Sequence, residues 1–353
     1  MSPLRPVLYT ALLAACLLGA APMAAESPKD EVDTCLSCHG EKGTEKKLPS
    51  GETRNLFVDR AVFEKSVHGA KLGCTGCHPG YQEMPHPERP AKDAQEFRAG
   101  FRDLCKSCHF ANYTKALDSV HFAALSKGNS AAPFCSDCHG AHDIARPNEP
   151  RTKISETCSG CHSGEAEAWA KSVHGETLAK TNSADVPVCT DCHKSHAIHD
   201  PRTQTARLHS PEVCAACHKD EKKMAKYGLS AKVYQTYVGD FHGRSASLYA
   251  GQTKAAEKVI AVCTDCHGFH EITRTDAAGS GVLKANLQKT CARCHPGAPP
   301  NFPAAWLSHY EPSPKKAPLV WATALFYKIL IPVMIGGLVL QILLHLWRVV
   351  VNK

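Results

Sequence analysis

Nine copies of the pattern Cys-x-x-Cys-His dominate this sequence and limit what it can fold into. Numbered in chain order as motifs 1 to 9, they occupy residues 35–39, 74–78, 105–109, 135–139, 158–162, 189–193, 214–218, 263–267 and 291–295. They contain eighteen of the nineteen cysteines, and the remaining one, Cys16, lies in an N-terminal apolar segment. Between residues 35 and 295, no thiol is left for a disulfide or for catalysis.

Cys-x-x-Cys-His is the attachment sequence of c-type haem. Its two thiols bond to the two vinyl groups on one porphyrin edge, and the adjoining histidine binds the iron. Zinc sites, disulfides and thioredoxin-like motifs do not require that histidine, and nine cysteine pairs cannot be divided into whole four-cysteine sites. We therefore expect nine covalent c-type haems. The attaching cysteines are Cys35, Cys38, Cys74, Cys77, Cys105, Cys108, Cys135, Cys138, Cys158, Cys161, Cys189, Cys192, Cys214, Cys217, Cys263, Cys266, Cys291 and Cys294. The predicted proximal iron ligands are His39, His78, His109, His139, His162, His193, His218, His267 and His295.

The number of residues per haem predicts the fold class. Residues 35–295 provide only about 29 residues for each haem, so the haems themselves are expected to form the core. The content of 24 Gly, 23 Pro and 7% aromatic residues favours loops over a sheet or an ordinary helical bundle. We expect a chain that is mainly α-helix and irregular loops wrapped around covalent haems, with one C-terminal transmembrane helix.

The formal net charge of +7 would by itself suggest a nucleic-acid partner. Nine haems, however, bring eighteen propionate groups, against at most nine positive charges from ferric iron. The haem-loaded protein is then net acidic, and we expect no nucleic-acid binding.

The first 25 residues have the pattern of an export signal. Arg5 precedes an apolar run over residues 7–20, and small residues lead to a cleavage site near Ala25. Residues 13–16, Leu-Ala-Ala-Cys, also resemble a bacterial lipobox, so lipidation at Cys16 is an alternative to simple cleavage. Because covalent haem attachment takes place outside the cytoplasm, the motifs and the signal indicate the same compartment.

A second apolar segment, residues 329–347, lies near the C-terminus and contains His345 as its one titratable group. As a helix it would be about 28 Å long, enough to cross a bilayer. The alternative is a buried core helix. Aromatic and basic residues flank the segment, as is typical of membrane interfaces: Trp321, Phe326, Tyr327 and Lys328 on one side, and Trp347, Arg348 and Lys353 on the other.

The predicted organisation is therefore a signal peptide (1–25), a nonahaem domain (26–310), a Pro-rich linker (311–318), a membrane anchor (319–348) and a cytoplasmic tail (349–353). Because the haem domain is exported, the anchor crosses the cytoplasmic membrane once and ends in the cytoplasm. The linker then holds the haem domain at the periplasmic face.

A repeat can be read four times: a histidine, a first motif with another histidine shortly after it, and a second motif. The repeats contain motifs 2–3, 4–5, 6–7 and 8–9, and motif 1 precedes them. His139 and His142 are too close in sequence to bind opposite faces of one iron, so His142 must serve a different haem. The predicted distal ligands are His68, His86, His121, His142, His174, His196, His242, His270 and His309, with His199 and His209 as alternatives for the ninth position. His345 is expected at the membrane interface and not on a b-type haem.

These motifs and histidines, over residues 30–310, resemble the multihaem cytochromes c with paired Cys-x-x-Cys-His motifs. That family includes class III cytochromes c, pentahaem donors to nitrite reductase and periplasmic decahaem conduits. The resemblance implies closely packed haems with two histidine ligands each. The C-terminal anchor differs from the soluble members and from tetrahaem quinol dehydrogenases, whose anchor is N-terminal. It favours a separate membrane cytochrome b, or another quinol-oxidising subunit, as the electron donor and periplasmic proteins as acceptors.

The function expected from this sequence is electron transfer without catalysis, because an iron with two histidine ligands has no open position for a substrate. Only Met84 and Met224 could supply methionine ligands in the exported domain, so low potentials should dominate. The alternatives are a multihaem oxidoreductase of the nitrite or hydroxylamine type with one open haem, and a haem-storage protein.

Overall fold

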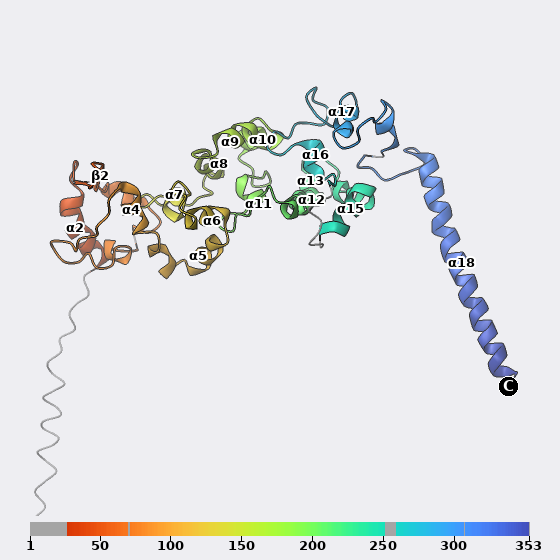
Figure 1. The fold of residues 1–353 in the computed structure, drawn as a ribbon, viewed down its shortest axis with the longest axis horizontal. Helices are drawn as coiled ribbons and strands as arrows, with labels where there is room; N and C mark the ends of the chain where they lie inside the picture. Colours follow the sequence, from red (N-terminus) through yellow and green to blue (C-terminus); the bar gives the residue numbers. More distant parts are fainter. Residues whose placement is uncertain (1–26, 70, 251–258, 307, 353) are drawn as a thin grey trace, which may run out of the picture. The chain divides into compact units, whose positions relative to one another are not determined.

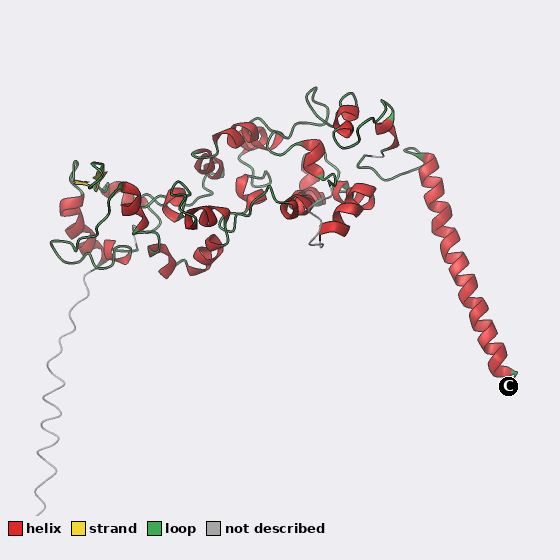
Figure 2. Ribbon diagram, viewed as in Figure 1, coloured by secondary structure: helices red, strands yellow, loops and turns green. Residues whose placement is uncertain are grey.

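The computed structural model describes residues 27–69, 71–250, 259–306 and 308–352. The predicted signal peptide and Cys16 lie outside the described residues. The chain divides into two compact units, Met1–Pro147 and Asn148–Lys353, a boundary that falls inside the predicted haem domain. Apart from the long C-terminal helix of the second unit, each unit consists of short helices joined by loops, with one pair of short strands among the described residues (Figures 1 and 2). The predicted fold class of helix and irregular loop is confirmed.

Unit 1 contains motifs 1 to 4. Its elements are α2 (Pro28–His39), β1 (Glu45–Lys47), β2 (Thr53–Asn55), α3 (Arg60–Lys65), η1 (Cys74–Gly76), α4 (Ala94–Ala99), η2 (Leu104–Ser107), α5 (Phe110–Leu117), α6 (Val120–Ser126) and α7 (Cys135–His139). The strands form an antiparallel hairpin in which Lys46 lies opposite Arg54. The helix α2 begins after Ser27 with Pro28 in its first turn, a position where the missing amide hydrogen costs nothing, and it ends at His39 of motif 1.

Unit 2 contains motifs 5 to 9 and the apolar C-terminal segment. Its elements are α8 (Thr152–Ser159), α9 (Ser163–Ala170), α10 (Val173–Thr181), α11 (Cys189–His193), α12 (Gln204–His218), α13 (Glu221–Lys226), α14 (Val233–Gly239), α15 (Phe241–Ala250), α16 (Cys263–His267), α17 (Leu287–Ala292), η4 (Phe302–Ala305) and α18 (Pro318–Val351).

The helices α6 and α10 each begin at the valine of a Ser-Val-His sequence, and both start in the same way. Ser119 Oγ accepts a hydrogen bond from the Phe122 amide at 3.1 Å, and Ser172 Oγ accepts one from Gly175 at 3.1 Å. Serine at this position satisfies an amide that the first helical turn leaves without a partner. The cap therefore fixes where the next residues, including His121 and His174, enter their helices.

Apolar side chains are buried in two small clusters of unit 2. One consists of Leu208, Tyr237, Ala246 and Ile260. The other, here called the Leu178 cluster, consists of Leu178, Val186 and Val188, with Ile154 and Trp169 packed against it. Clusters of this size bury little apolar surface for a chain of 353 residues, which agrees with the expectation that haem supplies most of the core.

The C-terminal helix α18 differs from every other described element in length and exposure. It contains 34 residues and is long and apolar enough to cross a membrane. None of the residues in its most apolar 18-residue stretch is buried. At 1.5 Å per residue it measures about 51 Å, longer than a hydrocarbon layer of about 30 Å. The helix therefore contains the predicted span 329–347 and extends it toward the linker (Figure 1).

Candidate haem-binding sites

Three of the four motifs that open repeats share one local structure, and the exception is motif 2, which forms the short 3-10 helix η1. Motifs 4, 6 and 8 each form a five-residue helix (α7, α11 and α16), in which the third residue is aspartate. This carboxylate accepts a hydrogen bond from the amide that precedes the motif, at 2.9 Å for Asp137, 2.7 Å for Asp191 and 2.7 Å for Asp265. An acidic residue in the first turn also interacts favourably with the helix dipole. The short helix is thereby held in shape, and its two cysteines are presented one turn apart.

A sharp turn follows each of these helices. The next residue has a positive φ: 76° at Gly140, 67° at Lys194 and 83° at Gly268. Glycine adopts this conformation without steric strain, whereas lysine does so at a cost. The turn directs the histidine that follows the motif away from the motif's own proximal histidine.

The structure brings seven proximal histidines next to seven of the predicted distal histidines. The pairs and the distances between their ring centres are His39–His86 (6.1 Å), His68–His109 (6.0 Å), His78–His142 (6.1 Å), His174–His218 (6.4 Å), His193–His270 (6.0 Å), His242–His295 (6.3 Å) and His267–His309 (6.3 Å). Every pair combines one motif histidine with one non-motif histidine.

These distances fit two imidazoles that bind opposite faces of one metal. With metal–nitrogen bonds of about 2 Å, and about 1 Å from each nitrogen to its ring centre, the ring centres lie about 6 Å apart. Contacting aromatic rings span a wider range, from about 4.5 to 7 Å. Seven values between 6.0 and 6.4 Å are therefore better explained by one common ligand geometry than by ring packing.

The pairing follows a rule set by the repeat. A histidine that precedes the first motif faces the second motif of its own repeat, as His68 faces His109 and His174 faces His218. A histidine that follows the first motif faces the first motif of the preceding repeat, as His142 faces His78. His142 thus lies beside a motif histidine other than that of motif 4.

The remaining predicted ligands occupy equivalent local positions. His121 is the second residue of α6, as His174 is of α10. His139 ends the helix α7, His162 is the N-cap of α9, and His196 follows the turn after α11. All four of these residues make interactions within the structure.

The alternative ligands lie elsewhere. His199 and His209 are exposed, and His209 Nδ1 donates a hydrogen bond to the Thr205 carbonyl at 2.8 Å. Met84 is 69% exposed, whereas Met224 is buried in α13. His309, the first choice for the ninth position, is one of the seven paired histidines.

Hydrogen bonding and burial prepare these histidines to bind iron. His39 Nδ1 donates to the Leu56 carbonyl at 3.0 Å, and His86 Nδ1 donates to the Glu83 carbonyl at 3.0 Å. Both bonds leave Nε2 with its lone pair free for a metal. Burial, together with the neighbouring His142, lowers the pKa of His78 to about 4. Burial, together with His218, lowers the pKa of His174 to about 4 as well. Both rings are therefore neutral at neutral pH, the form that coordinates a metal.

The surroundings of the motifs also fit haem. Phe110 directly follows His109 and is 68% exposed, and Phe241 directly precedes His242 and is 82% exposed. Thr264 Oγ1, inside motif 8, is buried without a hydrogen-bond partner among the described residues. Exposed aromatic rings beside the ligands can cover a porphyrin face, and a buried hydroxyl can bond to a haem carboxylate. The donor set and its surroundings therefore suit c-type haem.

Comparison with known proteins supports this chemistry. Residues 126–167, which contain motifs 4 and 5, match a family model described as "Doubled CXXCH motif". The chain belongs to the multihaem c-type cytochromes and binds c-type haem.

Two relatives are curated cytochromes. Cytochrome c3 of Desulfuromonas acetoxidans is 38% identical over 78 residues, which are 22% of this chain and 78% of the relative. High-molecular-weight cytochrome c of Nitratidesulfovibrio vulgaris is 21% identical over 295 residues, 75% of this chain. The matched part spans 46% of that larger cytochrome, about half its length. No solved structure matches the chain.

Proposed function

We propose that the protein conducts electrons through nine covalent haems at the outer face of the cytoplasmic membrane. In this proposal, electrons pass from a membrane cytochrome b or another quinol-oxidising subunit to periplasmic acceptors. The observation that carries it is the set of seven histidine pairs, each with one motif and one non-motif histidine about 6 Å apart. His121 and His196 are proposed as further distal ligands because they occupy the same places in their repeat.

Haem, when bound, supplies a one-electron redox centre whose potential depends on its axial ligands and on its burial. The chain's own residues define what this centre can do. In each pair, the two imidazoles would hold the iron from opposite sides, so no position would be left for nitrite, hydroxylamine or another substrate. This argument favours electron transfer over the oxidoreductase alternative.

The proposed location rests on α18 and on its connection to the haem domain. His309, in the pair with His267, precedes the first helical residue, Pro318, by nine residues. Nine residues span at most about 30 Å when fully extended. The haem of motif 8 is thus tethered near the membrane end of the domain, which supports electron entry from the membrane at this end.

Intact mass and electron paramagnetic resonance test the proposal together on the mature protein purified from membranes. We expect a mass corresponding to nine haems per chain, and ferric spectra in which essentially all irons are low-spin. A redox titration should then show reversible one-electron steps at mostly low potential. Fewer than nine haems would disprove the count. A stoichiometric high-spin iron that binds cyanide would instead favour the enzyme.

A further inference from the structure

Three arginines form a repeated ion pair that the haem motifs alone do not explain. Arg98, Arg151 and Arg207 each lie seven residues before the first cysteine of motif 3, 5 or 7. Each arginine forms an ion pair with the aspartate at the third position of the motif after that one, which is motif 4, 6 or 8. The pairs are Arg98–Asp137 (3.3 Å), Arg151–Asp191 (2.5 Å) and Arg207–Asp265 (2.6 Å).

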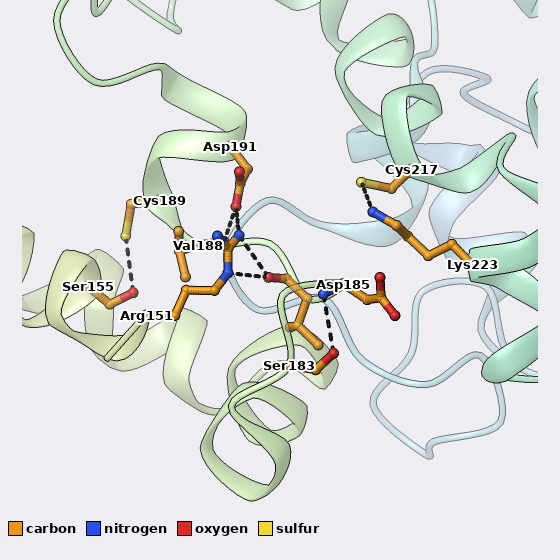
Figure 3. A network of polar contacts seen from close by, with 10 residues as sticks. Arg151, Ser155, Ser183, Asp185, Val188, Cys189, Asp191, Cys217 and Lys223 are labelled. Carbon is orange, nitrogen blue, oxygen red and sulfur yellow. Dashed lines mark hydrogen bonds and ion pairs between the residues drawn. The ribbon is translucent and has the colours of Figure 1, made fainter. Parts of the chain in front are cut away.

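The aspartate in each pair has two partners. Asp191 Oδ2 accepts from the Val188 amide, which shapes the motif 6 helix, and also from Arg151 Nη2 (Figure 3). Arg151 additionally donates to the Val186 carbonyl through Nε at 3.3 Å and through Nη2 at 3.1 Å. A guanidinium held by several acceptors has a defined position, unlike a flexible surface lysine.

Two of the three pairs include a partly buried side chain, whereas Arg98 and Asp137 are 54% and 39% exposed. The side chains of Arg207 and Asp265 are only 20% and 28% exposed, and Arg151 is 22% exposed. By contrast, Arg202 in the pair with Asp200 is 87% exposed. Partly buried pairs are screened less by water and salt, so they constrain their helices more strongly.

Each pair joins two consecutive motifs that belong to different repeats. Arg151 is the N-cap of α8, which carries Cys158, and α8 packs on the motif 6 helix α11. Arg207 lies in α12, which carries motif 7 and packs on the motif 8 helix α16. At the first junction, Arg98 lies in α4, which precedes motif 3, and its partner lies in the motif 4 helix α7.

The first cysteines of the joined motifs meet at all three junctions. The side chains of Cys105 and Cys135, of Cys158 and Cys189, and of Cys214 and Cys263 lie close enough to interact. Because each haem is bonded to its cysteines, the distance between two motif helices sets the distance between the two haem edges.

The sequence lacks this pair where no such junction exists. Motif 2, which has no repeat before it, contains Gly76 in place of the aspartate. Motif 9, which has no repeat after it, is preceded at the same spacing by Lys284. Between motifs 1 and 2 a different contact is used, in which a Glu31 carboxylate oxygen accepts from the Thr75 amide at 2.5 Å.

We propose that Arg98, Arg151 and Arg207, with their aspartates, are positioning residues that hold the haems of adjoining repeats in electron-transfer contact. This inference rests on the proposed function, since it requires bound haems that exchange electrons. In this inference, a charged side-chain pair fixes the contact between motifs 3 and 4, between motifs 5 and 6, and between motifs 7 and 8. These residues are separate from the cysteines and histidines that bind each haem.

The test uses the full-length haem-loaded protein with Arg207→Gln, Asp265→Asn and the double variant. Arg202→Gln, which removes an exposed pair of the same chemistry, is the matched control. Haem count and spin state are measured first. Intramolecular electron redistribution after flash photoreduction and haem–haem magnetic coupling in the ferric spectra are measured next.

We expect all variants to keep nine low-spin haems. Electron redistribution should slow by about tenfold in Arg207→Gln and in Asp265→Asn, because small displacements of reacting groups have large effects on rate. The double variant should be no slower than either single variant, since both remove one interaction. Arg207→Lys should recover part of the rate, and Arg202→Gln should leave it unchanged.

Rates within twofold of the parent protein in both single variants, with unchanged magnetic coupling, would overturn the inference. A parent protein with fewer haems or open irons would count against the proposed function instead. If Arg207→Gln does not mature, Arg98→Gln provides the same comparison at the most exposed of the three arginines, whose side chain is 54% exposed.

Discussion

Replacing His309 by alanine should convert one haem of nine from low-spin to high-spin. The ring of His309 lies 6.3 Å from that of His267 at an interplanar angle of 22°, so the two histidines would hold the iron of the motif 8 haem between them. Attachment requires only the two cysteines and the proximal histidine, all of which the variant keeps. The haem count should therefore stay at nine.

The size of the effect follows from the pairing. One iron in nine, about 11% of the haem, loses a strong-field ligand, and the others keep theirs. The potential of that haem should rise, since a nitrogen donor stabilises ferric iron. His309 is half-buried, and its buried Nδ1 has no hydrogen-bond partner among the described residues. Truncation therefore leaves space shaped for an imidazole, and added imidazole should restore the low-spin signal, as ligands fill engineered cavities.

The assay is a quantitative ferric electron paramagnetic resonance spectrum of the variant, before and after imidazole. His209→Ala and His199→Ala are matched controls, because both histidines are exposed and were the sequence-level alternatives for this position. We expect one high-spin iron per chain in His309→Ala and none in the controls. An unchanged spectrum in His309→Ala, or a high-spin iron in His209→Ala, would refute the assignment.

Three further outcomes are expected. Leu178→Ala, in a cluster where this side chain is 1% exposed, should lower the free energy of unfolding by about 2–5 kcal/mol in denaturant titrations, whereas the half-exposed Leu229→Ala should change it little. Deleting residues 319–353 should move the fully haem-loaded protein from the membrane to the soluble fraction, and quinol-driven haem reduction should fall at equal, low concentration; equal rates would contradict a membrane donor. The bidentate bonds from Arg202 lower the pKa of Asp200 to about 2, so the pair's small stabilisation is present above about pH 4 and is lost as pH falls through 2. Arg202→Gln should raise that pKa toward its ordinary value in an NMR titration.

Much of the site could be predicted from short stretches of sequence. Each haem attachment depends on five consecutive residues, so motif number, cysteines and proximal histidines are local properties that no tertiary contact needs to supply. The apolar length of residues 329–347 is similarly local, and it predicted the helix α18. The repeat also predicts the distal histidines as a set, because the same residue type recurs at the same place.

Partner assignment needed the tertiary structure. The sequence showed that His142 must serve another haem, but only the fold brings it to His78, 64 residues earlier. Sequence alone did not single out Arg98, Arg151 and Arg207. Their pattern can nevertheless be read from sequence: one motif has aspartate at its third position, and an arginine lies seven residues before the first cysteine of the preceding motif. Arg207 and Asp265 are 58 residues apart and meet only when their two helices pack. Haem attachment depends on residues adjacent in sequence and can therefore be predicted from sequence. Contacts between residues separated by long loops depend on how the chain folds, so they required the tertiary structure.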